Sequence, residues 1–502
     1  MRRVPGRALT AHLERWIGLD PRSLALLRIG LGLAVAADAW IRSGDVVAHY
    51  ADAGIVSRRD VLDEFAFLHR WAVSLHLAGG SAPFEAVLLG FAGLAGLALA
   101  LGYRTRVAVL AAWFLTSSVQ LRNLYIGAGY DALLRMLLLW GCFLPLGAAA
   151  SIDALGRPGA EARRPHVSVA GLGLILQMAF VFGVAGYAKW LEPAWRSGTA
   201  VADIFADEMR AGRLAELLGG QASLLGAATY AVPWVEMVGA ILFLSPVANG
   251  RLRAVAVLAL ALSVAAFGAT LEVGLFPLVA LAGLAGLLPR WFWEGPARRA
   301  GDALAGRRSA SPAADGERRR VGRGLAGALS SALVAYVAFW NVGVARDPSF
   351  RAPRAVAWFG ETLFLQQAWR MFAHPASRTG WLVMEGHLRD GRSADLFADG
   401  GRMPSLELAI RPIAWERPPV PAAHFASDRW RVFFERAVRG TGTERRLNLY
   451  GRFVCREWNR ARDRREDELL GFELWWIAAP LEPRPRVGEH VPQLIWRHHC
   501  FG

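Results

Sequence analysis

Long apolar runs alternate with short polar segments along the first two thirds of the chain. Each run is close to the ~20 residues that an α-helix needs to cross the hydrocarbon core of a bilayer. The pattern therefore predicts an α-helical polytopic membrane protein with about nine transmembrane helices. These spans are expected near residues 24–41, 84–103, 107–124, 131–149, 167–190, 229–247, 253–269, 271–289 and 324–345.

The last third of the chain has the mixed composition of a water-exposed domain. Asp390-Gly391 supplies a turn between two strand-like segments, GWLVMEGHL and SADLFAD. LNLYGRFVCREWNR has helical spacing, ELWWIAAP reads as a late strand, and ETLFLQQAWRMF as a helix. We expect a small C-terminal α+β domain. The predicted organisation is a transmembrane bundle (1–290), an arginine-rich cytoplasmic linker (291–322), a final transmembrane helix (323–347) and an extracytoplasmic domain (348–502).

A net charge of +15 would suit a protein that binds nucleic acid, but the positions of the arginines indicate a membrane protein instead. Hydrophobic residues make up 54% of the chain, and arginines gather beside alternate spans. Positive residues are retained on the cytoplasmic side of membranes. This distribution predicts a cytoplasmic N-terminus, an extracytoplasmic C-terminal domain and the lipid bilayer, not nucleic acid, as partner. The groups that set this orientation are Arg2, Arg3 and Arg7; Arg104 and Arg106; Arg157, Arg163 and Arg164; Arg251 and Arg253; and the cluster from Arg290 to Arg323.

Three cysteines add little to the picture. Cys142 falls in an apolar run, whereas Cys455 and Cys500 fall in the C-terminal domain and are able to pair, although no spacing requires it. No Cys/His cluster, phosphate-binding glycine loop or nucleophile elbow is evident, so the sequence predicts no metal site.

Lys189 is the only lysine among the 57 cationic side chains, and it lies near the end of a long apolar run. Arginine stays protonated in proteins, whereas a buried lysine is able to become a neutral base. Ionisable groups inside a membrane are candidates for function. The other interpretation is a lysine that extends to the interface beside Tyr187 and Trp190.

Other charges also fall within the predicted spans. Glu236 and Asp131 are the preferred partners for Lys189, and the alternative is that each only holds helices together. Asp131 and Arg135 are four residues apart, so a pair on one helix face is expected.

Several segments occur in an order that resembles the HTTM membrane domain. This domain is shared by vitamin K-dependent gamma-glutamyl carboxylase and many bacterial membrane proteins. The segments are RIGLGLAVAADAW, HYADAGIVS, NLYIGAGYDALLRMLLLWGCFLPLGAAASIDAL, VAGYAKWLEPAWRSGTAV, GLFP, QAWRMFAHP and LYGRFVCREWN. The resemblance covers nearly the whole chain and implies a multi-pass protein of a bacterial inner membrane.

The resemblance also implies roles for individual residues. Lys189 occupies the position of the lysine in an Ala-Gly-x-x-Lys motif, which acts in the carboxylase as the base on reduced vitamin K. Where the carboxylase has a histidine between the third and fourth spans, this chain has Asn123 and Tyr125. Ahead of GLFP it has Thr270 and Glu272 instead of a histidine. The implied cofactor is reduced vitamin K or another membrane quinol. Its expected contacts are Asn123, Tyr125, Asp131, Trp195 and Glu236.

The sequence thus supports two functions of different classes. One is a lyase-type enzyme that performs quinol-dependent carboxylation, or related quinone chemistry, with Lys189 as base and a protein substrate that the sequence does not specify. The other is a non-catalytic membrane scaffold or a protein that binds a lipid or quinone. A transporter is disfavoured because no inverted repeat is visible.

Overall fold

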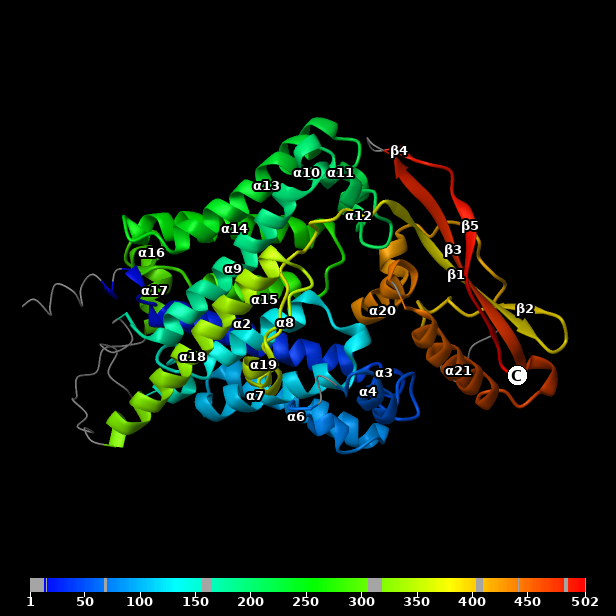
Figure 1. Cartoon of the computed structure of the whole chain (residues 1–502), viewed down its shortest axis with the longest axis horizontal. Coiled ribbons are helices and arrows are strands. Elements are labelled where there is room, and N and C mark those ends of the chain that lie inside the picture. The colour runs from blue at the N-terminus through cyan, green and yellow to red at the C-terminus, as the bar shows by residue number, and fades with distance from the viewer. Residues whose placement is uncertain are drawn as a thin grey trace, which may run out of the picture.

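The structure is a computed structural model that describes residues 13–14, 16–66, 70–155, 165–305, 318–402, 410–440, 442–482 and 486–501. It is mostly helical, and the helices form an elongated bundle with a small antiparallel sheet at one end (Figure 1). The predicted combination of an apolar helical bundle with a small C-terminal α+β domain is therefore confirmed.

Six helices in the described part of the chain are long and apolar enough to cross a membrane. Their lengths match the requirement of ~20 residues for a hydrocarbon core. They are α2 (Pro21–Ser43), α6 (Ala82–Leu101), α9 (Val169–Leu191), α13 (Ala222–Phe243), α14 (Asn249–Thr270) and the part of α18 (Arg318–Arg346) from Gly324 onward.

The other three predicted spans are helical but fall short of this requirement, so nine spans are not confirmed. α7 (Thr105–Arg122) has the length, but its C-terminal half carries polar residues such as Gln120. α8 (Gly129–Gly141) and α15 (Phe276–Ala285) have only 13 and 10 residues. Both are packed among longer helices, so neither has to match the thickness of a bilayer.

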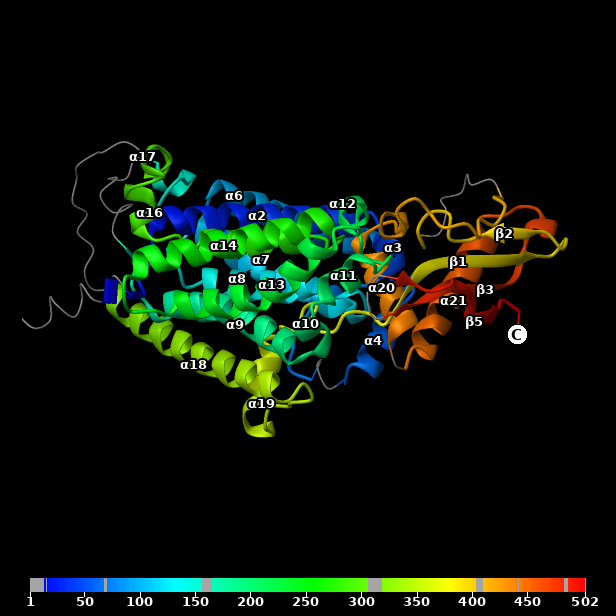
Figure 2. The ribbon, with the colours of Figure 1, turned by 90° about the horizontal axis from the view of Figure 1, so that it is seen from above.

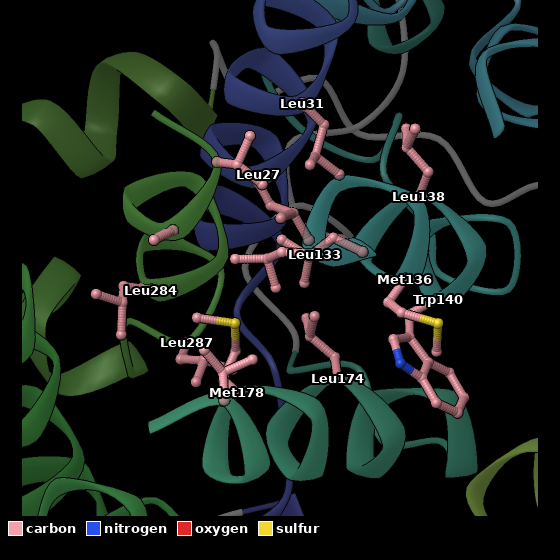
Figure 3. Close-up of a cluster of buried hydrophobic side chains, with 14 of the residues drawn as sticks. Leu27, Leu31, Leu133, Met136, Leu138, Trp140, Leu174, Met178, Leu284 and Leu287 are labelled. Atoms are coloured by element: carbon pink, nitrogen blue, oxygen red, sulfur yellow. The ribbon is translucent and has the colours of Figure 1, made fainter. Parts of the chain in front are cut away.

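The core of the bundle forms where α2, α8, α9 and α15 meet. Figure 3 shows Leu27 and Leu31 of α2 and Leu133 of α8 close together. Trp140 is fully buried against α9, where Gly173 leaves room for its ring: a Cβ there would lie 2.4 Å from the indole. α8 is buried along nearly its whole length because the longer helices surround it.

The first helices of the predicted linker lie at one end of the bundle. α16 (Arg290–Glu294) and α17 (Arg298–Ala305) lie there, at the end opposite the sheet (Figure 1). Ala150 donates a backbone hydrogen bond to Leu304, which brings the segment after α8 to the same end. The predicted linker (291–322) thus begins as short helices rather than as an irregular loop, and its middle part lies outside the described residues.

Short helices cover the opposite end of the bundle. After α9 the chain forms three short helices in succession. The short helices are α3 (Val46–His49), α4 (Arg58–Glu64), α10 (Pro193–Ser197), α11 (Ala200–Phe205) and α12 (Arg213–Leu218). One more short helix, α19 (Arg354–Thr362), lies with α18 along one flank of the bundle (Figure 2).

The C-terminal domain is an antiparallel sheet packed on two helices. β3 is central and pairs with β1 on one side and with β4 and β5 on the other. The predicted hairpin is confirmed, with Gly391 in the turn at φ 88°. The elements are β1 (Arg378–Leu388), β2 (Ser393–Asp395), α20 (Asp428–Arg439), α21 (Glu444–Arg460), β3 (Leu469–Glu482), β4 (Arg486–Val487) and β5 (Val491–His499).

The predicted helix and strand of this domain are confirmed as α21 and β3. α21 buries its apolar face, including Tyr450 and Val454, because that face meets the sheet. Cys455 of α21 forms a disulfide with Cys500, just after β5. The helix predicted over ETLFLQQAWRMF is wrong, since α19 ends at Thr362 and residues 365–370 have no regular secondary structure.

A buried network of four charges joins the C-terminal domain to the bundle. Asp38 and Asp131 of the bundle both pair with Arg42 and with Arg429 of α20. The Arg42 bonds are 2.7 and 2.8 Å long, and Arg429 lies 2.6 Å from Asp38. The network is neutral, which suits its burial. The predicted pair of Asp131 with Arg135 is wrong, because Arg135 donates to the carbonyl of Phe364, 2.7 Å away, among other acceptors.

Two further contacts support this junction. Burial lowers the pKa of His49 to about 4, and its neutral ring packs 4.3 Å from the Trp430 ring. Asp207 pairs with Arg439 at 2.6 Å. Burial alone would raise the pKa of the Asp207 carboxyl, but the Arg439 guanidinium outweighs it and holds that pKa below its usual value.

Arg429→Ala should destabilise the protein by about 3–5 kcal/mol, because it leaves two buried carboxylates with one arginine between them. We expect a lower midpoint of thermal unfolding in detergent and faster proteolysis between bundle and C-terminal domain. The control is Arg411→Ala, whose side chain is half exposed and 3.7 Å from its partner Asp399. Equal midpoints for the two variants would contradict the role given to Arg429.

Candidate functional site

Lys189 lies in the last turn of α9, and its side chain points into the protein. It is 1% exposed, and its Nζ lies 2.7 and 2.9 Å from the two carboxylate oxygens of Glu236 on α13. The interpretation of Lys189 as a lysine extended to the interface is therefore wrong. The expected pairing with Glu236 is confirmed, and pairing with Asp131 is not, since Asp131 belongs to the junction network.

The Ala-Gly-x-x-Lys spacing has a geometric explanation. Gly186 lies one turn before Lys189, and a Cβ there would lie 2.7 Å from the carbonyl oxygen of Pro233 and 3.0 Å from Cβ of Glu236. The glycine thus lets α13 approach α9 closely, and the next turn places lysine and glutamate in contact. Pro233 lies inside α13, one turn before Glu236.

Trp195 covers the pair from the short helix α10. The Lys189 ammonium lies 5.6 Å from the centre of its ring, within the range of a cation–π interaction. The indole Nε1 donates to the carbonyls of Phe372 and Ala373, each at 3.1 Å. Trp195 therefore connects the Lys189–Glu236 pair to the segment around Phe372 and Ala373, which leads into the C-terminal domain.

The remaining predicted site residues lie at the junction and not beside Lys189. Asn123 donates to the carbonyl of His49 at 3.0 Å and accepts from the backbone of Tyr125 at 3.1 Å. The Tyr125 hydroxyl donates to Glu64. These contacts and the arginine pairs of Asp131 hold together the end of the bundle that meets the C-terminal domain. The structure thus groups Lys189, Glu236 and Trp195, and separately Asn123, Tyr125 and Asp131.

Two cavities lie between the bundle and α20, and they share three lining residues: Tyr130, Asp428 and Arg431. The smaller cavity has a volume of about 230 Å³ and the larger about 770 Å³. The bundle side of the smaller cavity is apolar except for Arg210, and the α20 side carries the other charges. Its apolar lining comes from Val273, Phe276, Met371 and Phe372, and its charged lining from Arg210, Asp428, Arg431, Glu435 and Arg436.

The GLFP motif lies between these cavities. Gly274 has a φ of 59°, and a Cβ there would lie 2.7 Å from Oδ2 of Asp428 and 2.8 Å from the Tyr130 ring. The Oδ1 atom of Asp428 accepts from Arg431 at 3.1 Å, whereas the buried Oδ2 has no hydrogen-bond partner among the described residues. Asp428 therefore offers an unused acceptor beside the cavities.

Phe372 links the two parts of the candidate site. Its carbonyl accepts from Trp195, and its side chain lines the smaller cavity. Lys189 itself does not line either junction cavity. Tyr130, Asp428 and Arg431 were missed by sequence reasoning. Nothing local marks them, although Tyr130 lies next to Asp131 and Gly274 belongs to a motif that the resemblance highlighted.

No protein-family model matches this chain, and neither a characterised protein nor a solved structure is significantly similar to it. Within the described residues, no group of three or more His, Cys, Asp or Glu side chains is arranged to hold a metal ion. The candidate site is accordingly argued from its own geometry.

Gly186→Ala should weaken the Lys189–Glu236 contact, because the added methyl meets a backbone carbonyl that cannot move without shifting α13. We expect a loss of about 1–3 kcal/mol, as for other overpacked sites, measured as a lower unfolding midpoint in detergent. Gly90→Ala on α6 is the matched control, since no atom lies within 4 Å of its added methyl. It should be neutral or stabilising. Equal behaviour of the two variants would refute close approach at Gly186.

Proposed function

We propose that this protein is a bacterial membrane protein that binds an amphiphilic ligand, a quinol or a lipid, between its helical bundle and its C-terminal domain. One observation carries this proposal: apart from Arg210, the smaller junction cavity is apolar on the bundle side, and it is charged on the α20 side. Ligand sites are typically apolar pockets with a few polar groups that fix orientation. A molecule with a hydroxylated head and an apolar tail matches both sides of this cavity.

The residues present fit a quinol head group in one further respect. A quinol hydroxyl is a hydrogen-bond donor, and Oδ2 of Asp428 is an acceptor without a partner among the described residues. An unpaired buried acceptor costs free energy that a bound donor recovers. The resemblance to the HTTM domain of vitamin K-dependent gamma-glutamyl carboxylase, whose cofactor is reduced vitamin K, points to the same ligand class.

The proposed location is a bacterial inner membrane, with a cytoplasmic N-terminus and an extracytoplasmic C-terminal domain. Two observations support this orientation. The arginine-rich α16 and α17 lie at the end of the bundle opposite the sheet, as the positive-inside rule requires. The disulfide between Cys455 and Cys500 lies in the C-terminal domain, and disulfides persist outside the cytoplasm.

A second candidate function is an enzyme that uses the quinol, with Lys189 as base, in carboxylation or related quinone chemistry. The observation that favours it is the burial of Lys189, the residue at the lysine position of the Ala-Gly-x-x-Lys motif, whose Nζ lies 2.7 Å from the Glu236 carboxylate. General bases in enzymes are typically placed in such buried sites. A bound quinol, oxidised by molecular oxygen, would supply the strong base that such a carboxylation needs. Against this candidate, Trp195 and Phe372 separate Lys189 from the junction cavity.

Filling the smaller cavity should abolish ligand binding. Met371→Trp adds volume in a space of about 230 Å³, so we expect at least a tenfold loss of labelling by a photoreactive naphthoquinone in proteoliposomes. Leu258→Trp on α14, which is 54% exposed on the bundle surface, is the control and should label as wild type. Labelling that is unchanged in Met371→Trp, or that maps away from residues 273–276 and 371–372, would contradict the proposed site.

Lys189→Arg separates the two candidate functions. Arginine keeps the charge opposite Glu236 but does not give up its proton near neutrality. If Lys189 is the base, oxidation of a reduced naphthoquinone, with or without bicarbonate, should fall by about 100-fold or more in proteoliposomes. The unfolding midpoint should stay near the wild-type value. Undiminished turnover would remove Lys189 from the chemistry, and wild-type protein that labels without turnover would leave ligand binding as the function.

A further inference from the structure

Phe372 has a backbone conformation that bulky residues rarely adopt. Its φ is 55°, in the left-handed region, where a β-carbon crowds the neighbouring backbone. Phe372 is the third residue of a turn that is closed by a 3.1 Å hydrogen bond from the Ala373 amide to the carbonyl of Arg370. Glycine or asparagine is usual at such a position. Strained residues of this kind persist only where the surrounding structure holds them, and they gather at ligand sites and switches.

Three side chains of the bundle hold Phe372 in this conformation. Its ring stacks on Phe267 of α14, with the ring centres 5.4 Å apart, and the Arg210 guanidinium lies 5.5 Å from the centre of the Phe372 ring. Its carbonyl accepts a hydrogen bond from the Trp195 indole at 3.1 Å. Each of these contacts is of modest strength. Phe372 is therefore held in place without being locked.

Phe372 lies where the two groups of the candidate site meet. Its ring lines the smaller junction cavity, and its carbonyl bonds to Trp195, whose ring lies 5.6 Å from the Lys189 ammonium. Lys189 is buried and lines neither junction cavity. The chain of contacts from the cavity to the lysine thus runs through Phe372 and then through Trp195.

A change of backbone conformation at Phe372 would alter both contacts together. Rotation about its N–Cα bond moves its ring and its carbonyl relative to the preceding chain. A return to negative φ relieves the crowding at the β-carbon, and this gain offsets part of the free energy of the contacts that are lost. The ring would leave the wall of the cavity, and the Trp195 indole would lose one of its two acceptors. The closed and open arrangements are therefore closer in free energy than they would be for an unstrained wall.

We propose that Phe372 is a movable partition between the smaller junction cavity and Lys189. In the described arrangement it closes the cavity and shields the lysine. When its backbone leaves the left-handed region, the cavity and the Lys189–Glu236 pair become one space. The inference rests on the proposed ligand site at the junction, and it states how a ligand bound there reaches the buried lysine.

The chain has a single lysine, so the labelling of amines reports directly on this partition. Naphthyl isothiocyanate is an apolar reagent with the ring system of a naphthoquinone, and it couples to amines in one step. Full-length protein in detergent is incubated with the reagent. Peptide mass mapping then follows the Lys189 adduct, with the α-amine of the chain as internal reference. A minor conformation is typically populated at about 0.1–10%, so wild-type Lys189 should react slowly but measurably.

Removal of the partition should expose the lysine to the reagent. Phe372→Gly should raise the rate of Lys189 labelling at least about tenfold, because the ring is lost and the closed state no longer limits access. Phe372→Asn should act in the same direction. Asparagine tolerates the left-handed region, so this variant keeps the turn if glycine loosens it.

Two further variants test the residue and the route. Phe364→Gly is the matched control, because Phe364 also has a positive φ, 51°, but lines neither junction cavity. It should change the Lys189 rate less than twofold. Met371→Trp, added to Phe372→Gly, should return the rate toward the wild-type value, because the larger side chain refills the smaller cavity.

Several results would overturn the proposal. Wild-type rates in both Phe372 variants, or equal acceleration in Phe364→Gly, would remove Phe372 from the path to Lys189. Acceleration that persists after Met371→Trp would place the path outside the cavity. Full protection of wild-type Lys189 over a day, with fast reaction in Phe372→Gly, would make Phe372 a fixed wall. Because this reaction uses no quinol, it tests the partition separately from the photolabelling that tests the ligand site. Unfolding midpoints of each variant separate an opened path from a lost fold.

Discussion

The structure depends on the pairing of charges that are buried away from water. An isolated charge in an apolar interior costs several kcal/mol even after relaxation, so each must have a partner in the final fold. In this chain the partners usually come from different elements. Lys189 and Glu236 join α9 to α13, and the four charges at the junction join α2 and α8 to α20. These pairs fix which elements are neighbours, whereas apolar contact alone would permit several arrangements.

The same constraint explains which parts of the structure could be predicted. The six long apolar helices, the hairpin around Gly391, and α21 follow from local periodicity and turn chemistry, which a single sequence displays. The Lys189–Glu236 pair could be expected because both residues stand out in apolar runs. The partner of Asp131 could not, since Arg429 lies 298 residues away and is one of many arginines in a polar segment. Choosing among those arginines requires the tertiary fold.

The errors have physical reasons of the same kind. The apolar residues of α8 and α15 predict membrane spans, but a helix buried on all sides is as apolar as one in lipid. The segment ETLFLQQAWRMF has helical spacing, yet most of it has no regular secondary structure, because its backbone groups contact other elements. Arg135 and Trp195 both donate to its carbonyl groups, so those carbonyls have partners without helical hydrogen bonds. Tyr130 and Asp428 acquire their importance only when α20 lies over the GLFP segment.

The junction network also has a consequence for how the protein is made. The chain is synthesised from its N-terminus to its C-terminus. Asp38 and Asp131 are therefore present in the nascent bundle long before Arg429 has been synthesised. Arg42 is the only cation of that network available in the interval, and it must serve two carboxylates. The helices around α2 and α8 are therefore expected to stay loosely associated, and open to quality-control proteases, until the last quarter of the chain arrives. Assembly of the bundle would then be completed only when the C-terminal domain has folded against it.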